Sequence, residues 1–441
     1  MEKQKKGKIL IGFIIFTSLL LIGTIVFSLM RHEEPYRYFT GLGSTFELSP
    51  DDEQYLLSYY IDGKESIYQA NVDGSDVMKL TDSPNERHHQ PRYSNDGETI
   101  LFLANNNEER INTLYTANSN GSEPKRVSPV DTHVSEAVFS ATGEEIYFVG
   151  IPAEEYNKAE GEATEGYDLY VAHLADGKVE QITDKDHFTM NFLSVSHNGK
   201  EVYYSLFDGT KEKVTAFSIE DRTEKSAPGA NQLPTDTYWF RYSPDGTKIA
   251  YTTVSDESRD TSLFQYELFL FDIESGVTKR LTHLESSVVS PRFFKNQNKI
   301  AFLEYTNWPG APEEHALKIV DIETEEIQEI KLALSSSNSN HFWMKTLDTF
   351  ANGNTLMVFY VVLLALVSTY LGRYQSKKKS YLPATASLIL ALVVFISSFI
   401  VGFTVDPWYG IGLGMLAAAI LGCTVVVFIY SFVLNLFIKR K

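Results

Sequence analysis

One turn pattern recurs six times through the middle of this 441-residue chain, and it constrains the fold more than any other feature. Its fourth position is serine in five copies and phenylalanine in the sixth, at spacings of 45, 46, 56, 47 and 51 residues. A period of about 40–50 residues that combines strands with glycine turns is typical of a β-propeller, in which each repeat forms one four-stranded blade. The copies are FELSPDD (46–52), PRYSNDG (91–97), AVFSATG (137–143), LSVSHNG (193–199), FRYSPDG (240–246) and PRFFKNQ (291–297).

Each copy is followed by segments that favour strands. An aliphatic and aromatic run comes first, as in residues 99–104 and 248–254, and it suits a strand that is packed on both faces. A second run, a turn that is often Asp-Gly or Asn-Gly, and a short fourth strand complete the repeat. One repeat cannot bury both faces of its sheet alone, whereas a closed ring of six can. We therefore predict an all-β six-bladed propeller over residues 46–334, with the Asp-Gly and Asn-Gly residues acting as turn formers rather than ligands.

The repeat resembles the TolB-type six-bladed propeller repeat, whose turn reads apolar-x-aromatic-Ser-Pro-Asp-Gly. The copy at 240–246 matches that turn closely, the first and last copies depart from it, and the resemblance covers about residues 45–334. It implies the fold rather than a function, because TolB-type propellers include protein-interaction modules and the propeller halves of prolyl-oligopeptidase-like enzymes. The flanking apolar segments resemble no family that we can name.

Four uncharged apolar segments flank the repeats. Residues 9–30 form an uncharged run of 22 residues, which is long enough to cross a bilayer core of about 30 Å. We expect an uncleaved anchor here; the alternative is a cleaved signal peptide, whose apolar region is normally shorter and ends in small residues. After the repeats, three further membrane helices are predicted near residues 355–371, 381–403 and 411–438.

Basic residues mark the ends of these segments that we expect to face the cytoplasm. They lie before the first span, between the second and third spans, and after the fourth, so the positive-inside rule places both termini in the cytoplasm and the propeller outside it. The predicted organisation is a basic tail (1–8), an anchor (9–30), a linker (31–45), the propeller (46–334), a second linker (335–353) and three transmembrane helices (354–441).

Charge and cysteine content agree with an external domain. Outside the membrane, 28 Lys and Arg stand against 55 Asp and Glu, a net charge near −27. Such a field disfavours nucleic acid and favours cationic partners, although solubility alone also explains it. The single cysteine, Cys423, falls in the last span, so the external domain has no disulfide. That absence favours a multi-pass protein of a bacterial cell membrane.

One face of the propeller is the candidate binding face. Long insertions at 151–166, 255–265 and 306–315 fall in loops between second and third strands, and the first of them is acidic, with Glu160 among its carboxylates. Histidine and aromatic residues gather in connections to the same face. We interpret them as a funnel for a protein or cell-envelope ligand; the alternative is that they fill the spaces between blades. The histidines lack a ligand spacing, so we expect no metal. The candidates are His88, His89, His133, His187, Tyr238, Trp239, His283 and Trp308.

Three arginines share one position in their first strands: Arg92, Arg241 and Arg292, with Glu47 as the equivalent residue of the first copy. First strands line the central channel of a propeller, so these residues are candidates for a polar channel that takes an anionic group. The alternative, which we favour, is that they pair with carboxylates between blades, because burying them unpaired is costly.

The last span carries a stripe of small residues at intervals of four. This spacing puts them on one helical face and permits close packing against another span, with dimerisation as the alternative. The residues are Gly410, Gly414, Ala418 and Gly422.

Motifs that indicate catalysis are missing from the sequence. It has no Gly-x-Ser-x-Gly, no phosphate loop, no His-Glu-x-x-His and no Cys-x-x-Cys, and the span interiors carry no charged residue of the kind that transporters use. We therefore expect a non-catalytic interaction scaffold or ligand-sensing module at the cell envelope, with no cofactor. The alternatives are a hydrolase or lyase with its active site on the propeller face, and a signalling regulator that works through a membrane partner.

Overall fold

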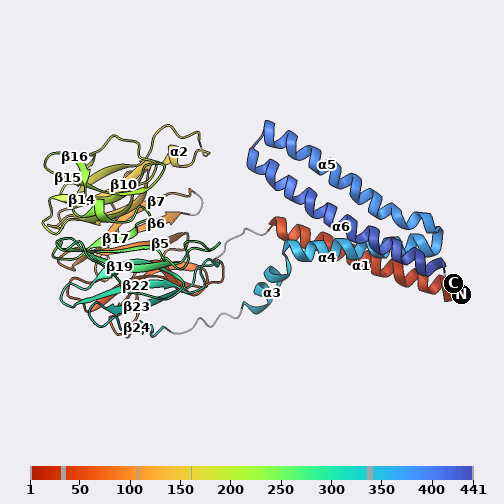
Figure 1. Ribbon diagram of the computed structural model, residues 1–441, viewed down its shortest axis with the longest axis horizontal. Coiled ribbons are helices and arrows are strands. Elements are labelled where there is room, and N and C mark those ends of the chain that lie inside the picture. Colours follow the sequence, from red (N-terminus) through yellow and green to blue (C-terminus); the bar gives the residue numbers. More distant parts are fainter. Residues whose placement is uncertain (1, 31–35, 107–108, 160, 335–340, 440–441) are drawn as a thin grey trace. The chain divides into compact units, whose positions relative to one another are not determined.

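The computed structural model describes residues 2–30, 36–106, 109–159, 161–334 and 341–439 (Figure 1). The chain divides into a β unit, Pro35–Ser339, and a helical unit, which comprises Met1–Glu34 and Asn340–Lys441. Several predicted features lie partly outside the described residues: residues 31–35 and 335–340 of the two linkers, Glu160 of the first insertion, and residues 440–441 of the C-terminal basic cluster.

The β unit is built from consecutive four-stranded antiparallel groups, numbered here sheet 1 to sheet 6 within the described residues. Strands pair in chain order within each sheet, and one parallel pair, Tyr266 with Ser287, joins sheets 5 and 6. Sheet 1 contains β1 (Gly41–Leu48), β2 (Gln54–Ile61), β3 (Lys64–Asn71) and β4 (Met78–Lys79); sheet 2 contains β5 (Glu86–Tyr93), β6 (Thr99–Asn106), β7 (Asn112–Asn118) and β8 (Lys125–Arg126); sheet 3 contains β9 (Thr132–Phe139), β10 (Glu145–Pro152), β11 (Asp168–His173) and β12 (Val179–Gln181); sheet 4 contains β13 (Asn191–Val195), β14 (Glu201–Phe207), β15 (Glu212–Ser218) and β16 (Thr223–Ser226); sheet 5 contains β17 (Tyr238–Tyr242), β18 (Lys248–Val254), β19 (Tyr266–Asp272) and β20 (Thr278–Arg280); sheet 6 contains β21 (Ser287–Phe293), β22 (Lys299–Tyr305), β23 (His315–Asp321) and β24 (Ile327–Ile330).

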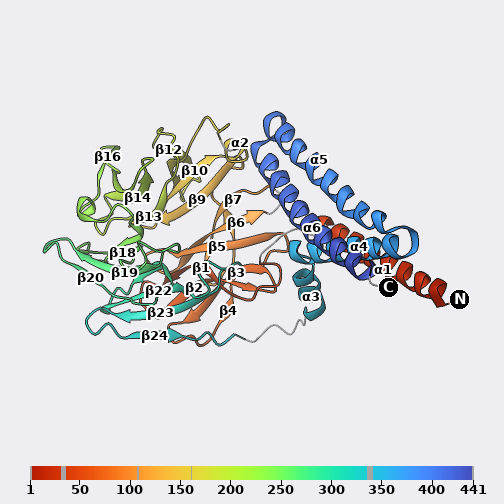
Figure 2. The ribbon, with the colours of Figure 1, turned by 45° about the vertical axis from the view of Figure 1, so that its right-hand side comes forward.

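Neighbouring sheets bury their apolar side chains against each other. In the described part of the β unit, each successive pair of sheets has its own buried cluster, and sheets 6 and 1 share one as well. In that last cluster, Phe294 and Leu303 of the sixth repeat lie with Phe46 and Tyr55 of the first. First strands of neighbouring sheets are also in contact, β21 with β1 included, and Figure 2 shows the sheets side by side. The first and last sheets of the unit are therefore neighbours.

The serine of the recurrent turn is a structural residue. Ser94 Oγ donates to Asp96 at 2.6 Å and accepts from the backbone N of Thr99 at 3.0 Å, and Gly97 takes a φ of 75°. Ser243 makes the same two kinds of bond, at 2.6 and 2.9 Å. A short polar side chain and a glycine are what such a turn requires, because the serine bonds its own backbone and glycine adopts positive φ without strain.

The two copies that depart from the turn pattern meet each other. Asp52 occupies the glycine position of the first copy at a φ of 65° and is buried. Its two carboxylate oxygens accept from the backbone N of Lys295 at 2.8 Å and of Asn296 at 2.7 Å, in the turn of the last copy. Asp52 thus bonds the last repeat to the first, and a glycine in its place would lose these two hydrogen bonds.

Both segments predicted as linkers contain regular structure. β1 begins at Gly41, whose partner is Tyr60 in β2, so residues 41–45 belong to sheet 1. In the second segment, helix α3 (Phe342–Phe350) forms because its apolar residues recur within a helical period. These bounds replace the linkers 31–45 and 335–353 expected from the sequence.

Within the described residues, four helical segments are long and apolar enough to cross a membrane. Hydroxyl groups join the last three of them: Tyr360 donates to Ser387 at 2.8 Å, and Ser387 lies 2.6 Å from Thr424. The helical unit contains α1 (Glu2–Met30), α3, α4 (Gly353–Tyr370), the π-helical η2 (Leu371–Gln375), the 3-10 helix η3 (Lys377–Tyr381), α5 (Leu382–Thr404) and α6 (Pro407–Lys439); the β unit also holds α2 (Ala153–Tyr156) and η1 (Ala230–Gln232).

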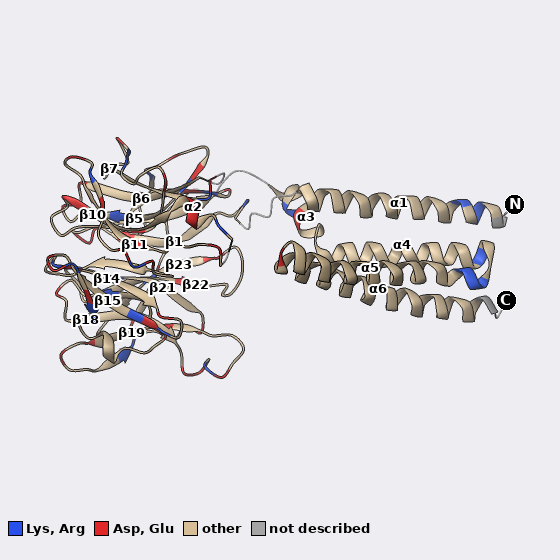
Figure 3. Ribbon diagram, turned by 90° about the horizontal axis from the view of Figure 1, so that it is seen from above, with Lys and Arg blue, Asp and Glu red and all other residues tan. Residues whose placement is uncertain are grey.

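Most basic residues of the helical unit gather at one end of it (Figure 3). Gly7 of α1 lies against the ring of Tyr374 in η2, where an added Cβ would be 3.3 Å away. The start of α1 therefore lies beside the end of α4. Figure 3 shows the lysines of α1 and the basic α4–α5 connection at this same end.

Candidate functional site

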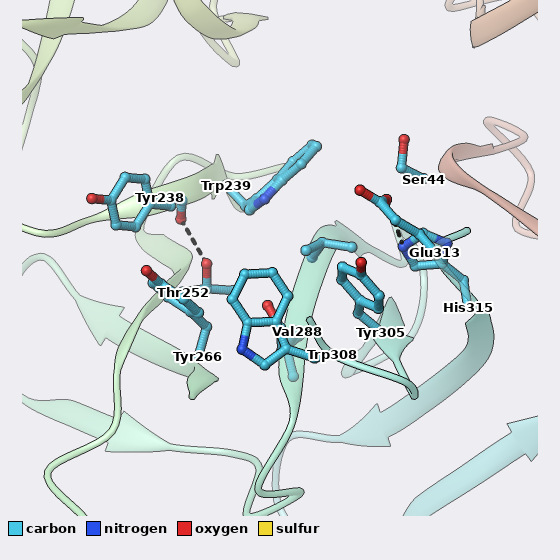
Figure 4. Close-up of a pocket in the computed structure, with 12 residues that line it drawn as sticks. Ser44, Tyr238, Trp239, Thr252, Tyr266, Val288, Tyr305, Trp308, Glu313 and His315 are labelled. Atoms are coloured by element: carbon cyan, nitrogen blue, oxygen red, sulfur yellow. Dashed lines mark hydrogen bonds and ion pairs between the residues drawn. The ribbon is translucent and has the colours of Figure 1, made fainter. Parts of the chain in front are cut away.

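A pocket of about 340 Å³ lies between sheets 5 and 6 and is lined mainly by aromatic side chains (Figure 4). This volume is at the small end of the range for ligand pockets, about 300–1,000 Å³. Its lining combines rings with a few polar groups, the usual composition of a small-molecule site. The lining residues are Ser44, Tyr238, Trp239, Thr252, Tyr266, Ser287, Val288, Val289, Tyr305, Trp308, Glu313 and His315.

A β-bulge positions Trp239. The pairing of β17 with β18 shifts register between Tyr238 and Arg241, and Trp239 within that shift has a φ of 48°. A bulge turns the side chain of the extra residue away from the direction that the pleat would give it. Phe192, the equivalent bulge residue of sheet 4, has a φ of 62° and its ring centroid lies 5.0 Å from that of Trp239. The positive φ at the bulge is thus a feature of the repeat, and the tryptophan side chain is what is particular to the pocket.

Trp308 is held by hydrogen bonds on two insertions. Its indole Nε1 donates to the carbonyl of Phe264 at 2.8 Å, which ties the loop 306–315 to the loop 255–265. Asn307 closes the same loop, because its amide donates to Pro312 O at 2.9 Å and its oxygen accepts from the N of Glu314 at 2.9 Å. The Trp308 ring is therefore fixed before any ligand arrives.

Glu313 and His315 form the polar side of the pocket. Glu313 Oε2 lies 3.6 Å from Nε2 of His315, whose side chain is almost fully buried. Burial lowers the pKa of His315 to about 4, so the ring is neutral at pH 7. Burial also raises the pKa of Glu313. The carboxyl group consequently faces a neutral histidine and lacks a cationic partner among the residues that line the pocket.

The pocket brings together three of the predicted site residues, Tyr238, Trp239 and Trp308. The histidines lie elsewhere. His89 and His133 both bond Asn112, at 3.3 and 3.1 Å.

The other predicted histidines are His88, His187 and His283, and the first two contact neighbouring side chains. His88 packs against the ring of Phe102 with centroids 4.9 Å apart, and His187 lies 3.1 Å from Glu224. His283 is exposed at the surface. Burial lowers the pKa of His133 to about 4 and lowers those of His88 and His89, so these three rings are packed as neutral groups.

Sequence reasoning missed Tyr266, Tyr305, Glu313 and His315. They stand at or beside strand ends that border the second and third insertions, which is the signal that would have found them. The described residues of the first insertion, 151–159 and 161–166, contribute nothing to the pocket lining. Its α2 places Tyr156 on His133, with ring centroids 3.6 Å apart.

The three predicted channel arginines form a buried charged cluster, called here the arginine centre: Glu47, Arg92, Glu136, Arg241 and Arg292. Glu47 Oε2 accepts from Arg92 at 3.0 Å and from Arg292 at 3.1 Å. Burial alone would raise the pKa of Glu47, but the guanidinium groups of Arg292 and Arg92 outweigh it and hold that pKa below its ordinary value. Arg241 donates to the carbonyl oxygens of Phe192 and Phe240 at 2.8 and 2.9 Å.

Only part of the small-residue stripe of α6 is packed. A Cβ on Gly410 would lie 2.5 Å from Cα of Gly402 in α5, so glycine is required at that approach. Gly414 faces Ser398 of α5 more loosely, at 3.9 Å. Ala418 and Gly422 are exposed in the helical unit.

Among the described residues, no cluster of three or more His, Cys, Asp or Glu side chains has the arrangement to hold a metal ion. The pocket lining offers ring faces, hydroxyl groups and one carboxyl group.

Comparison with known proteins gives a partial family match. Residues 355–435, which correspond to α4–α6, match the family model described as YesK-like protein. This corrects the expectation that the flanking segments resemble no known family, since the three C-terminal helices do. No curated protein matches the chain.

Several solved structures are similar to the β unit. TolB from Acinetobacter baumannii shares 15% identity over 67% of this chain and 64% of its own, with a TM-score of 0.47. An oligogalacturonate lyase from Vibrio parahaemolyticus shares 12% identity over 65% and 91% of the two chains, with a TM-score of 0.46. A puromycin-hydrolyzing peptidase from Mycobacterium tuberculosis shares 12% over 68% and 54%, also at 0.46. These neighbours include enzymes and TolB alike, so no activity is assigned from them.

Proposed function

We propose that the β unit is a closed six-bladed propeller of the TolB type, held outside the cytoplasm of a bacterial cell by four membrane spans. Closure is supported by the cluster shared by sheets 6 and 1, and by the bonds that Glu47 and Asp52 make to the last repeat. The exposed apolar residues of α1, α4, α5 and α6 support membrane insertion. The basic end of the helical unit supports cytoplasmic termini.

Helix α3 supports the same orientation. Two residues separate it from α4, and it exposes Trp343 and Phe350, at 75% and 63%. Aromatic residues that adjoin a span favour the headgroup level of a bilayer. We therefore place α3 on the outer membrane surface, opposite the basic end.

The propeller acts, in this proposal, as a non-catalytic binding module at the cell envelope. The observation that carries it is the aromatic pocket between sheets 5 and 6, whose rings are fixed by the Trp308–Phe264 bond and the Trp239 bulge. Ring faces held in place before binding lose little entropy when a ligand arrives. Buried aromatic anchors of this kind supply much of the binding free energy in known interfaces.

Capture from cell-envelope extract tests this function. The full-length protein in lipid nanodiscs is compared with the Trp308→Ala variant, and bound molecules are identified by mass spectrometry. We expect a species that is retained unchanged by the wild type and lost from the variant. Because Trp308→Ala removes packing, Trp308→Phe and a thermal unfolding measurement verify that the fold is intact. If no species depends on Trp308, the pocket is not the binding site.

A second candidate, a hydrolase or lyase, is favoured by one observation, the Glu313–His315 pair at the pocket wall. A carboxyl group with a raised pKa beside a neutral imidazole is suited to acid–base chemistry. The same capture experiment separates the two candidates: an enzyme would convert the species that the wild type takes up, and Glu313→Gln would stop the conversion.

A further inference from the structure

We propose that the pocket between sheets 5 and 6 recognises an organic cation, namely an alkylammonium group. This inference rests on the proposed binding function and names the chemistry of its ligand. It follows from how the rings are oriented, which polar groups are already used, and where charge is left uncompensated.

The rings form walls rather than a single flat platform. Trp308 lies at 77° to Tyr305 and at 88° to Tyr266, with centroids 5.1 and 5.9 Å apart. Figure 4 shows Trp239 on the opposite side of the same space. A sugar ring stacks its C–H face on one open aromatic face, whereas several aromatic rings at steep angles surround a compact group. Such a box is the arrangement that binds ammonium groups through cation–π attraction.

Three polar groups of the lining are already engaged. Trp308 Nε1 donates to Phe264 O, and the Tyr305 hydroxyl donates to Gly310 O. Thr252 donates its hydroxyl to Tyr238 O at 3.3 Å. The ring faces and one carboxyl group of the lining remain available to a ligand.

That carboxyl group supplies negative charge without compensation. Glu313 is half-buried, its neighbour His315 is packed as a neutral ring, and the lining contains no lysine or arginine. Anionic ligands would meet repulsion there, and a neutral ligand would leave the charge without a partner. A cation is instead attracted both by the carboxylate and by the quadrupoles of the rings. The excess of acidic residues in the whole chain acts in the same direction.

Titration with two probes of equal shape tests the charge preference. Choline carries a quaternary ammonium group, and 3,3-dimethylbutan-1-ol replaces its nitrogen by carbon. The full-length protein is placed in phosphatidylglycerol nanodiscs, which contain no ammonium group, and binding is followed by calorimetry and tryptophan fluorescence. Nα-acetyl-lysine methylamide, as a third probe, distinguishes a primary from a quaternary ammonium. We expect at least one ammonium probe to bind, and 3,3-dimethylbutan-1-ol to bind at least about tenfold more weakly than choline if choline is the probe bound.

Two carboxylate variants complete the test. Glu313→Gln keeps the shape and removes the charge, and we expect about a tenfold loss of ammonium affinity. Glu314→Gln, at the next and exposed position, is the matched control and should leave it unchanged. Equal binding of the charged and neutral probes, or an unchanged affinity in Glu313→Gln, would overturn the cation assignment while leaving the pocket as a binding site. If no ammonium probe binds, the cation assignment fails too, and only the capture from envelope extract then decides whether the pocket binds at all.

Discussion

The arginine centre and the aromatic pocket both contain residues that stand out from the repeat. They differ in whether their carboxylate has a cationic partner. In the arginine centre, Glu47 contacts two guanidinium groups at about 3 Å. In the pocket, Glu313 faces a neutral histidine, and the residues that line the pocket include no lysine or arginine. Conspicuous residue types therefore do not identify a site by themselves. The difference lies in whether each charge already has its partner inside the fold.

Removing the shared carboxylate should have the largest effect. Glu47→Gln removes the carboxylate that Arg92 and Arg292 share and leaves Arg92 the looser 4.0 Å pairing with Glu136. We expect the β unit to lose about 3–5 kcal/mol of unfolding free energy. Urea unfolding with hydrogen exchange of sheets 1 and 6 measures it, with exposed Glu53→Gln as control. A loss below about 1 kcal/mol would mean that the arginine centre is not structural.

Asp52 offers an intermediate case, because its carboxylate is buried but bonds only backbone groups. Asp52→Asn replaces one acceptor oxygen by a donor that faces another N–H, at a cost of about 1–3 kcal/mol. Hydrogen exchange should show the loss first in the turns 49–54 and 294–299. Uniform destabilisation of all sheets, with these turns no more affected than others, would contradict a role for Asp52 in joining the ends.

Acid should separate the two regions. The pKa of Glu313 is raised by burial, so lowering the pH neutralises it early and ammonium affinity should fall by about tenfold. The groups around it stay neutral in that range, since the pKa of His315 is about 4 and those of Tyr36 and Tyr305 are raised.

The arginine centre should resist the same acidification. The pKa of Glu47 is lowered, so its contribution to stability is fully present above the ordinary pKa of a glutamate and is lost only as pH falls through the lower folded value. Calorimetric titration and thermal unfolding across the same pH series check both parts. Loss of stability before loss of binding would contradict this order.

Arg241→Met should have the smallest effect. Among the described residues, Arg241 makes no ion pair within 4 Å, and its buried Nε lacks a hydrogen-bond partner. Burial and the other two arginines lower its pKa well below the ordinary value, so its charge is an unfavourable one. We expect unfolding free energy to change by less than about 1 kcal/mol. Arg292→Met, which loses the bond to Glu47, should cost at least about 1 kcal/mol more.

The repeat could be predicted from the sequence because its key residues interact within their own turn. Ser94 and Gly97 act within their own turn, so the spacing and identity of such residues predicted the strands that follow them. The bond from Asp52 to the last repeat depends on chain segments over 240 residues apart, and no local pattern encodes it. Likewise the hydroxyl contacts of Ser387 depend on how the helices pack.

The pocket was predictable only in part for the same reason. Trp239 and Trp308 stood out as aromatic residues in connections and insertions. In the sequence, Glu313 and His315 look like ordinary loop and strand-end residues. Their place in the pocket depends on how a neighbouring sheet packs, and the sequence pattern does not show that packing. The histidines in the connections were equally conspicuous in the sequence, but in the structure most of them are packed in the interior as neutral rings.

Photocrosslinking in intact cells tests most directly whether the pocket is a working binding site. A photoreactive amino acid replaces Phe264, which is 48% exposed beside the pocket, or Val277, which is 59% exposed beyond the other end of β19. We predict a crosslinked species at position 264, detected by its mass shift, that is absent at 277 and lost when Trp308→Ala is added. Equal crosslinking at both positions, or crosslinking at 264 that does not depend on Trp308, would contradict the assignment of this pocket as the binding site.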